Sequence, residues 1–379
     1  MNSKTFCPLL WNHQFIDGTG RVKPCCRFSN SDSPEEMNLK DHSFDDIFYG
    51  EWMNTLREKA LNGDPISGCV RCYEEERGGK RSLRERMIAR TDTGSKTVNI
   101  NEPVVSNLEM AISNDCNLMC RMCDSRFSYK LYDEEVEFKG EELAHPKRTK
   151  VNLDFVYKKL STLKYLKFTG GEPLTIKDHW DLLEHAVEKG YSHNIILNYS
   201  TNGTVWPKEK IVNLWSQFKR IELCVSFDSV IKEENEYLRH LTNQESVIKN
   251  IEKYLELRKT LPIHVISRPT ITILNMYHLP ETIEFLENKG IGVNPTHLTK
   301  PEYLSVTVLP KHTKDLIKEK FEKYNYTTPN SKNLSLYLLN YMLSADNSKW
   351  LPKFLKHTEF LDKKRNQSFK DVYSYYNFG

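Results

Sequence analysis

Three cysteines stand close together in this chain, at Cys116, Cys120 and Cys123, with the spacing C-x3-C-x2-C. The spacing indicates that one tight loop carries all three thiols. Three thiolates can hold three irons of a four-iron cluster and leave the fourth iron open, and an open coordination position distinguishes a reactive metal site from a sealed one. For the triplet taken alone, zinc binding and three buried thiols without a metal are the alternatives.

A glycine turn follows further along the chain. The β-rich run Tyr165–Thr169 leads directly into Gly170, Gly171, Glu172 and Pro173, a sequence typical of a loop. Paired glycines let a backbone approach a ligand closely. Taken alone, this stretch also fits an ordinary turn with an exposed glutamate.

Two further β-rich runs, 195–199 and 221–227, end in polar residues. Asn202-Gly203 is also a common turn dipeptide. An arginine further on, Arg239, has a guanidinium fork that suits a carboxylate, and a solvated arginine on a helix face is the alternative. Cys224, inside the second run, is interpreted as a buried core thiol. The candidates from this part of the chain are Ser200, Asn202, Ser226, Asp228 and Arg239.

In this order, the cysteine triplet, the Gly-Gly-Glu-Pro turn and the polar strand ends resemble the signature of the radical S-adenosylmethionine (radical SAM) superfamily. The resemblance implies that the open iron takes the amino and carboxylate groups of S-adenosylmethionine. It further implies that the reduced cluster cleaves the sulfonium, which gives methionine and a 5′-deoxyadenosyl radical that abstracts hydrogen from a substrate.

The same resemblance implies cofactor contacts. The glycine turn would bind the methionine amino group, with Glu172 as the acceptor. The polar strand ends would face the ribose and carboxylate, and Arg239 would pair with the carboxylate. Met122 stands where many relatives carry an aromatic residue against adenine, and a methionine can pack on a purine face. Neither further adenine contacts nor a general base or radical quencher can be assigned.

A second group of cysteines lies near the N-terminus. A hairpin is expected around the Asp17-Gly18 turn. The later C-x2-C pair follows a glycine, which is a common arrangement for zinc or iron–sulfur ligands. Together they supply enough thiolates for a four-cysteine site. The group consists of Cys7, Cys25, Cys26, Cys69 and Cys72.

This arrangement resembles the twitch or SPASM-like auxiliary-cluster module of radical SAM enzymes, placed here before the core instead of after it. The ligands that the resemblance implies are Cys7, Cys25, Cys69 and Cys72, with Cys26 as the alternative to Cys25. The second cofactor would be an auxiliary [4Fe-4S] cluster that accepts or relays an electron, and a structural or substrate-anchoring role is the alternative. Zinc is the rival metal, because a four-thiolate cage suits both.

Composition limits the possible partners. Lys and Arg number 54 and Asp and Glu number 51, a formal charge of +3, which argues against a protein built to bind nucleic acid. No apolar run reaches membrane-spanning length and no signal peptide is expected. The basic run Lys363–Arg365, beside Asp362, is interpreted as solvated surface. Reduced thiolate ligands predict a cytoplasmic protein.

Strand and helix patterns alternate between about 105 and 300, which predicts α/β architecture with a parallel sheet and right-handed crossovers. Six such units resemble the partial (β/α)6 barrel of radical SAM enzymes. The candidate residues then fall at the carboxyl ends of strands, where ligands bind. The predicted domains are the auxiliary-cluster domain 1–100, with a linker at 92–96, the barrel core 101–300 and a helical C-terminal extension 301–379.

The sequence thus predicts a radical SAM enzyme that takes electrons from a flavodoxin or ferredoxin. Auxiliary clusters of this kind often accompany peptide or protein modification in related enzymes, so a peptide or protein is the expected substrate. Three alternatives are open: a radical oxidase of sugars or amino acids, an activating protein whose radical acts on a partner enzyme, and a zinc-binding interaction module without catalysis.

Overall fold

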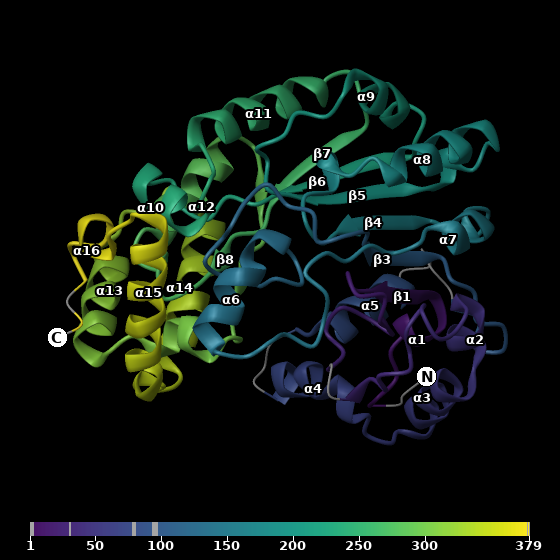
Figure 1. The fold of residues 1–379 in the computed structure, drawn as a ribbon, viewed down its shortest axis with the longest axis horizontal. Helices are drawn as coiled ribbons and strands as arrows, with labels where there is room; N and C mark the ends of the chain where they lie inside the picture. Colours follow the sequence, from purple (N-terminus) through teal and green to yellow (C-terminus); the bar gives the residue numbers. More distant parts are fainter. Residues whose placement is uncertain (1–3, 30–31, 78–80, 93–97, 377, 379) are drawn as a thin grey trace. The chain divides into compact units, whose positions relative to one another are not determined.

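The computed structural model describes residues 4–29, 32–77, 81–92, 98–376 and 378 (Figure 1). Most of the predicted linker at 92–96 lies outside the described residues. The chain divides into two compact units. Unit 1 comprises Met1–Asp115, Arg148–Tyr199 and Pro207–Ile221, and unit 2 comprises Cys116–Lys147, Ser200–Trp206 and Glu222–Gly379.

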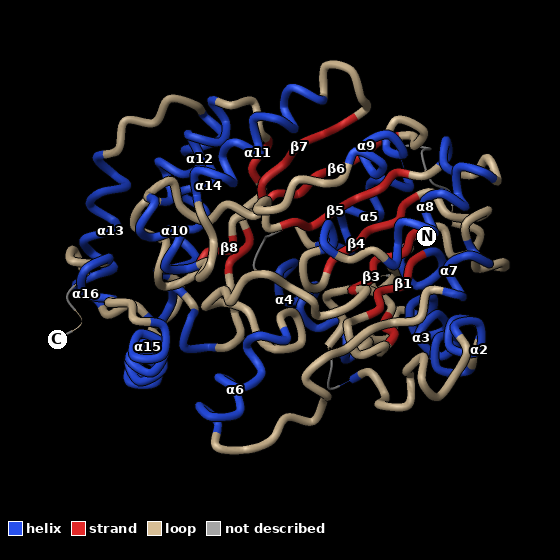
Figure 2. The backbone as a smooth tube through the Cα atoms, turned by 45° about the horizontal axis from the view of Figure 1, so that its top comes forward, coloured by secondary structure: helices blue, strands red, loops and turns tan. Residues whose placement is uncertain are grey.

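Unit 1 contains a largely parallel sheet with the strand order β2-β1-β3-β4-β5. Strands β1 and β2 form an antiparallel hairpin, and β1, β3, β4 and β5 run parallel to their neighbours. Figure 2 shows β3, β4 and β5 side by side. The strands are β1 (His13–Ile16), β2 (Val22–Lys23), β3 (Asn107–Ala111), β4 (Tyr165–Thr169) and β5 (Ile196–Thr201), whose last two residues belong to unit 2.

The two faces of this sheet differ in chemistry, because side chains alternate along a strand. One face carries buried residues such as Leu166, Phe168 and Tyr199, and His179 and Trp215 from the helices pack against it. The other face carries the ion pair Glu109–Lys167. The helices of this unit are α1 (Leu9–Asn12), α2 (Phe44–Tyr49), α3 (Glu51–Asn62), α4 (Val70–Arg77), α5 (Leu83–Asp92), α7 (Asp154–Lys159), α8 (Asp178–Glu188) and α9 (Glu209–Trp215).

Unit 2 continues the parallel pattern with the order β6-β7-β9 and adds the two-stranded sheet β8-β10. Its strands are β6 (Arg220–Val225), of which the first two residues belong to unit 1, β7 (Ile263–Ser267), β8 (Thr270–Ile271), β9 (Gly292–Val293) and β10 (Thr296–His297). Its helices are α6 (Tyr132–Lys139), α10 (Lys232–Leu238), α11 (Gln244–Leu257), α12 (Leu279–Asn288), α13 (Lys311–Lys323), α14 (Pro329–Leu343), α15 (Leu351–Arg365) and α16 (Phe369–Val372).

The predicted α/β class is confirmed, and the strand order ends at β2 and β9 without closing, as a partial barrel requires. The runs 264–273 and 292–297 each form two short strands in place of one, β7 and β8 in the first and β9 and β10 in the second. Pro269 and Pro295 stand at the breaks, where a residue without an N–H cannot continue the ladder. Beyond residue 300 the chain is helical, and its apolar core in unit 2 includes Leu338, Met342 and Phe354 of α14 and α15.

Candidate active site

The cysteine triplet forms the loop that follows β3 and belongs to unit 2. Cys116 is half-buried, Cys120 is buried and Cys123 is exposed. The backbone N–H of Cys123 donates to the carbonyl of Cys120 over 3.1 Å, and the N–H of Leu118 donates to the Cys116 sulfur over 3.4 Å. These bonds hold the predicted tight loop together.

Helix α10 provides the backbone support for this loop. The N–H of Met119 donates to the His240 carbonyl over 3.0 Å, and the N–H of Arg121 donates to the Leu238 carbonyl over 2.8 Å. The loop therefore pairs with the end of the helix that leads to Arg239. Arg239 is thus placed beside the cysteines by hydrogen bonds between main-chain atoms.

Arginines from both ends of unit 2 anchor the same loop. The Arg121 guanidinium lies 3.6 Å from the centre of the Tyr237 ring and pairs with Asp362 at 2.5 Å. Arg365 donates to the Met119 carbonyl over 2.8 Å and pairs with Glu134 at 2.6 Å. The interpretation of the run Lys363–Arg365 as solvated surface is therefore wrong for Arg365, and the adjoining Asp362 takes part in the same contacts. Sequence reasoning missed these residues because a charged run is usually a surface feature.

Two of the polar candidates reach the sulfurs of the triplet, and a third pairs with one of them. The Asn202 amide donates toward the Cys116 sulfur over 3.9 Å, and the Arg239 guanidinium donates toward the Cys120 sulfur over 3.8 Å. Arg239 also forms a buried ion pair with Asp228 at 2.7 Å. The sulfurs therefore have polar donors beside them, a surrounding that suits thiolate ligands of a cluster.

The remaining strand-end candidates, Ser200 and Ser226, also belong to unit 2. Ser200 is half-buried near the end of β5. The Ser226 N–H donates to the Thr201 carbonyl over 2.9 Å, which continues the pairing of β5 with β6. Met122 is partly buried and packs against the apolar core of unit 2.

The Gly-Gly-Glu-Pro turn belongs to unit 1 and packs on the residues just before Cys116. The Gly171 N–H donates to the Ser113 carbonyl over 3.0 Å, and the Glu172 N–H donates to the Asp115 carbonyl over 2.8 Å. A methyl group on Gly171 would lie 2.0 Å from the Asp115 carbonyl oxygen. Gly170 has a φ of +100°, a conformation that favours glycine. Close approach of two backbones therefore requires both glycines.

Glu172 is fully buried in this turn, so the alternative of an ordinary turn with an exposed glutamate is wrong. Its carboxylate accepts a hydrogen bond from the Leu174 N–H over 3.1 Å, at the start of the short helix 173–175. A buried carboxylate suits an ammonium ligand.

The second group of cysteines surrounds a cavity in unit 1. Its lining includes four thiols, two guanidiniums and apolar side chains: Cys7, Leu9, Cys25, Arg27, Phe28, Gly68, Cys69, Cys72, Leu83 and Arg84. Gly68 is needed here, because a methyl group on it would lie 2.1 Å from the Phe28 ring. Burial raises the pKa of Cys7, Cys25 and Cys69. Such buried thiols are poorly ionised without a metal.

Cys26 does not line this cavity. It is exposed, and its thiol donates a hydrogen bond to Glu109 on β3. Among the described residues, no three or more His, Cys, Asp or Glu side chains are arranged to hold a single metal ion. The four thiols thus share a cavity without converging on one point. Four thiols around one cavity fit a four-cysteine iron–sulfur cluster.

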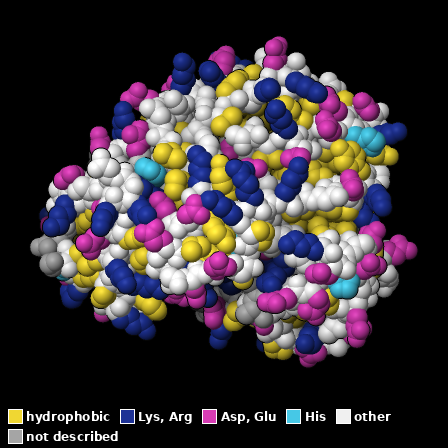
Figure 3. Space-filling model, in the orientation of Figure 1, with side chains coloured by type: hydrophobic (Ala, Val, Ile, Leu, Met, Phe, Trp, Pro, Cys, Tyr) yellow, Lys and Arg dark blue, Asp and Glu magenta, His cyan; other side chains and the backbone are white. Residues whose placement is uncertain are grey.

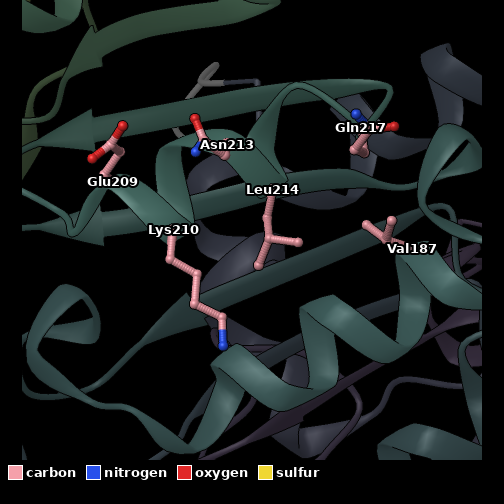
Figure 4. Close-up of a pocket in the computed structure, with 6 residues that line it drawn as sticks. All are labelled: Val187, Glu209, Lys210, Asn213, Leu214 and Gln217. Atoms are coloured by element: carbon pink, nitrogen blue, oxygen red, sulfur yellow. The ribbon is translucent and has the colours of Figure 1, made fainter.

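Another hollow lies in unit 1 between α8 and α9 (Figure 4). It is lined by Val187, Glu209, Lys210, Asn213, Leu214 and Gln217. None of the candidate residues belongs to it. The hollow is open, and Lys210 pairs with Glu184 at 2.6 Å. Figure 3 shows that charged side chains of both signs are scattered over the visible face of the molecule.

Comparisons with known proteins agree with this chemistry. The family model "Radical SAM superfamily" matches residues 110–286, a range that contains the triplet, the glycine turn and Arg239. The model "Iron-sulfur cluster-binding domain", of SPASM type, matches residues 7–73, which contain all five N-terminal cysteines.

The individual relatives have low sequence identity to this chain. A GTP 3′,8-cyclase of Campylobacter fetus is 25% identical over 57% of this chain and 66% of its own. The radical SAM cyclopropyl synthase TigE of Paramaledivibacter caminithermalis is 24% identical over 56% of this chain and 43% of its own. The match thus spans less than two thirds of either relative. The crystal structure of Streptococcus suis SuiB bound to S-adenosylmethionine has 15% identity and a TM-score of 0.41, and the match covers 81% of this chain and 60% of SuiB.

The chain thus contains a region, 110–286, that matches the radical SAM superfamily, and a region before it, 7–73, that matches the SPASM-type iron–sulfur cluster-binding domain. This confirms the predicted family, the N-terminal place of the auxiliary module and the expectation of an enzyme. The cofactors that these domains imply are S-adenosylmethionine, a [4Fe-4S] cluster and an auxiliary iron–sulfur cluster. Within the part of the chain that the structure describes, none of the helices is long and apolar enough to cross a membrane.

Proposed function

We propose that this protein binds a [4Fe-4S] cluster through Cys116, Cys120 and Cys123 and uses it on S-adenosylmethionine. The observation that carries the proposal is the convergence of Asn202 and Arg239 on the sulfurs of the triplet. A reduced cluster bound there would supply the electron for cleavage of the sulfonium to methionine and a 5′-deoxyadenosyl radical, which would take a hydrogen atom from the substrate.

The side chains of this protein hold and orient the cofactor. Glu172, buried in the glycine turn, accepts the methionine ammonium. Arg239 faces the carboxylate and is held in position by Asp228. Ser200, Asn202 and Ser226 provide polar groups near the ends of β5 and β6, and Met122 packs against the adenine.

The auxiliary cluster is assigned to Cys7, Cys25, Cys69 and Cys72. The cavity that these four thiols line supports this set, and Cys26 is left out because its thiol faces Glu109 instead. Metal analysis has to show that this site binds iron and not zinc, because a four-thiolate cage suits both metals. We also propose that the domain borders lie near residues 100 and 300.

The proposed substrate is a peptide or protein, modified or oxidised with the help of the auxiliary cluster. The alternative is a small molecule, which the GTP 3′,8-cyclase relatives favour. On the sheet face of unit 1 opposite α8 and α9, the cation of Lys167 is paired with Glu109 at 2.6 Å, so its charge is not available for a triphosphate. This pairing and the near-neutral net charge support the peptide class. The proposed electron donor is a flavodoxin or ferredoxin of the cytoplasm.

The test is anaerobic purification with iron, sulfide and zinc analysis, followed by an assay for 5′-deoxyadenosine under dithionite. About eight irons per chain and release of 5′-deoxyadenosine support the two-cluster enzyme. Zinc alone without cleavage overturns it in favour of an interaction module. A panel of peptides and GTP then tests the substrate: if hydrogen is lost only from GTP, the peptide class is wrong.

A further inference from the structure

Two arginines share the cavity of the four N-terminal thiols, and each is held by a carboxylate. Arg27 donates to both carboxylate oxygens of Glu75 over 2.5 and 2.6 Å. Arg84 donates to Glu76 over 3.0 and 2.5 Å and to the Phe6 carbonyl over 3.1 Å. Both guanidiniums are thus fixed in place beside the thiols.

The carboxylates come from the helix that also carries a thiol. Glu75 and Glu76 lie on α4, one turn after Cys72. The side chains of Arg27 and Arg84 are 18% and 10% exposed. Charges so little exposed to water act strongly on their surroundings. One short helix therefore carries Cys72 and both carboxylates.

The two cations share the cavity with the thiols. Arg27 and Arg84 line it together with Cys7, Cys25, Cys69 and Cys72, so a cluster held there has two guanidiniums beside it.

We propose that Arg27 and Arg84 raise the reduction potential of the cluster that the four thiols hold, and that Glu75 and Glu76 limit this rise. The inference rests on the proposed auxiliary cluster. A four-thiolate cluster becomes more negative when it gains an electron, so a nearby cation stabilises the reduced form. A raised potential is what an electron acceptor requires, which favours the accepting role over a purely structural one.

A structural role makes a different prediction. If Arg84 only fastened α4 to the Phe6 carbonyl, then removing either member of the Arg84–Glu76 pair would loosen the cavity in the same way. If the charges set the potential, removing the cation and removing the anion must shift it in opposite directions. The sign of the shift therefore separates the two roles.

The experiment is a redox titration of the full chain, monitored by the electron paramagnetic resonance of the reduced cluster. Cys116, Cys120 and Cys123 are first replaced by alanine, so that only the N-terminal cluster contributes. Arg84→Met is expected to shift the reduction equilibrium at least tenfold against the reduced form, which is about 59 mV for one electron. Glu76→Gln is expected to shift the equilibrium toward the reduced form. If Arg84→Met does not fold, Arg84→Lys is the second variant, because it keeps the positive charge.

The matched control is Arg77→Met. Arg77 lies on α4 beside Glu76, its side chain is exposed, and it does not line the cavity, so the potential should stay unchanged. Equal potentials in all variants, or shifts of the same sign in Arg84→Met and Glu76→Gln, overturn the inference and leave the auxiliary cluster in place. Zinc instead of iron in this background overturns both.

Discussion

The guanidinium of Arg365 donates to the backbone carbonyl of Met119 over 2.8 Å, although the two residues are 246 positions apart. Arg365 is the last residue of α15, and Met119 lies between the first two cysteines of the triplet. The helical C-terminal extension thus provides part of the support for the proposed cluster loop.

Replacing Arg365 with methionine should weaken this support. The change leaves the Glu134 carboxylate and the Met119 carbonyl without the guanidinium, and breaking a buried ion pair from one side costs about 3 kcal/mol. We expect a lower urea midpoint and fewer irons per chain after anaerobic reconstitution. Lys364→Met is the control, because Lys364 is 42% exposed in its pair with Glu137 and such pairs contribute less than about 1 kcal/mol. Wild-type iron content in both variants would contradict this role.

The sequence predicted features that are formed by residues close together in the chain, and it did not predict contacts between residues far apart in the chain. The triplet and the glycine turn are short motifs, and the strand and helix patterns arise from residues close in sequence. In contrast, Asp362 and Arg365 belong to a run of charges that looks like any solvated helix end. Only the tertiary fold brings them to the cysteine loop, so no local pattern could have revealed their role.

The choice between Cys25 and Cys26 was also beyond the sequence. The two thiols are adjacent in a turn that follows β2, and their side chains point in different directions. Cys25 lines the cavity with Cys7, whereas Cys26 faces Glu109. The side on which the other thiols lie depends on the pairing of the β1–β2 hairpin with β3, and these segments are far apart in the sequence.

Gly171 should not tolerate alanine. The added methyl group would lie 2.0 Å from the Asp115 carbonyl oxygen, so the turn must move away from the residues that precede Cys116. We expect Gly171→Ala to lose most S-adenosylmethionine cleavage, measured as 5′-deoxyadenosine under dithionite. Gly190→Ala is the control: its φ is +70° and its new methyl group meets nothing within 4 Å, so it should cost about 1 kcal/mol and leave cleavage intact. Equal cleavage in the two variants would refute the proposed role of the turn.

The two adjacent cysteines should respond differently to serine. Cys25→Ser removes a thiol from the cavity, and we expect loss of about four irons per chain. Cys26→Ser keeps a donor toward Glu109 and should retain the iron of the wild type. Iron and sulfide analysis after anaerobic reconstitution measures both. The reverse pattern would make Cys26 the ligand and contradict our assignment.

His179 should make unit 1 sensitive to acid. It is fully buried between Phe168 and Tyr199, and burial lowers its pKa from 6.5 to about 4. Because the unfolded chain takes up the proton first, stability is complete above pH 6.5 and falls as the pH approaches 4, by about 3 kcal/mol at most.

The variant His179→Gln removes this titration while keeping a polar side chain of similar size. Its free energy of unfolding is expected to be lower than that of the wild type at pH about 7, because a buried amide replaces the ring. The difference should shrink as the pH falls toward about 4.5, since only the wild type loses the contribution of a neutral imidazole. Loss of iron in acid affects both proteins alike, so the difference between their urea denaturation curves isolates the histidine. A difference that stays constant with pH would mean that His179 has an ordinary pKa and that its burial does not govern the acid response.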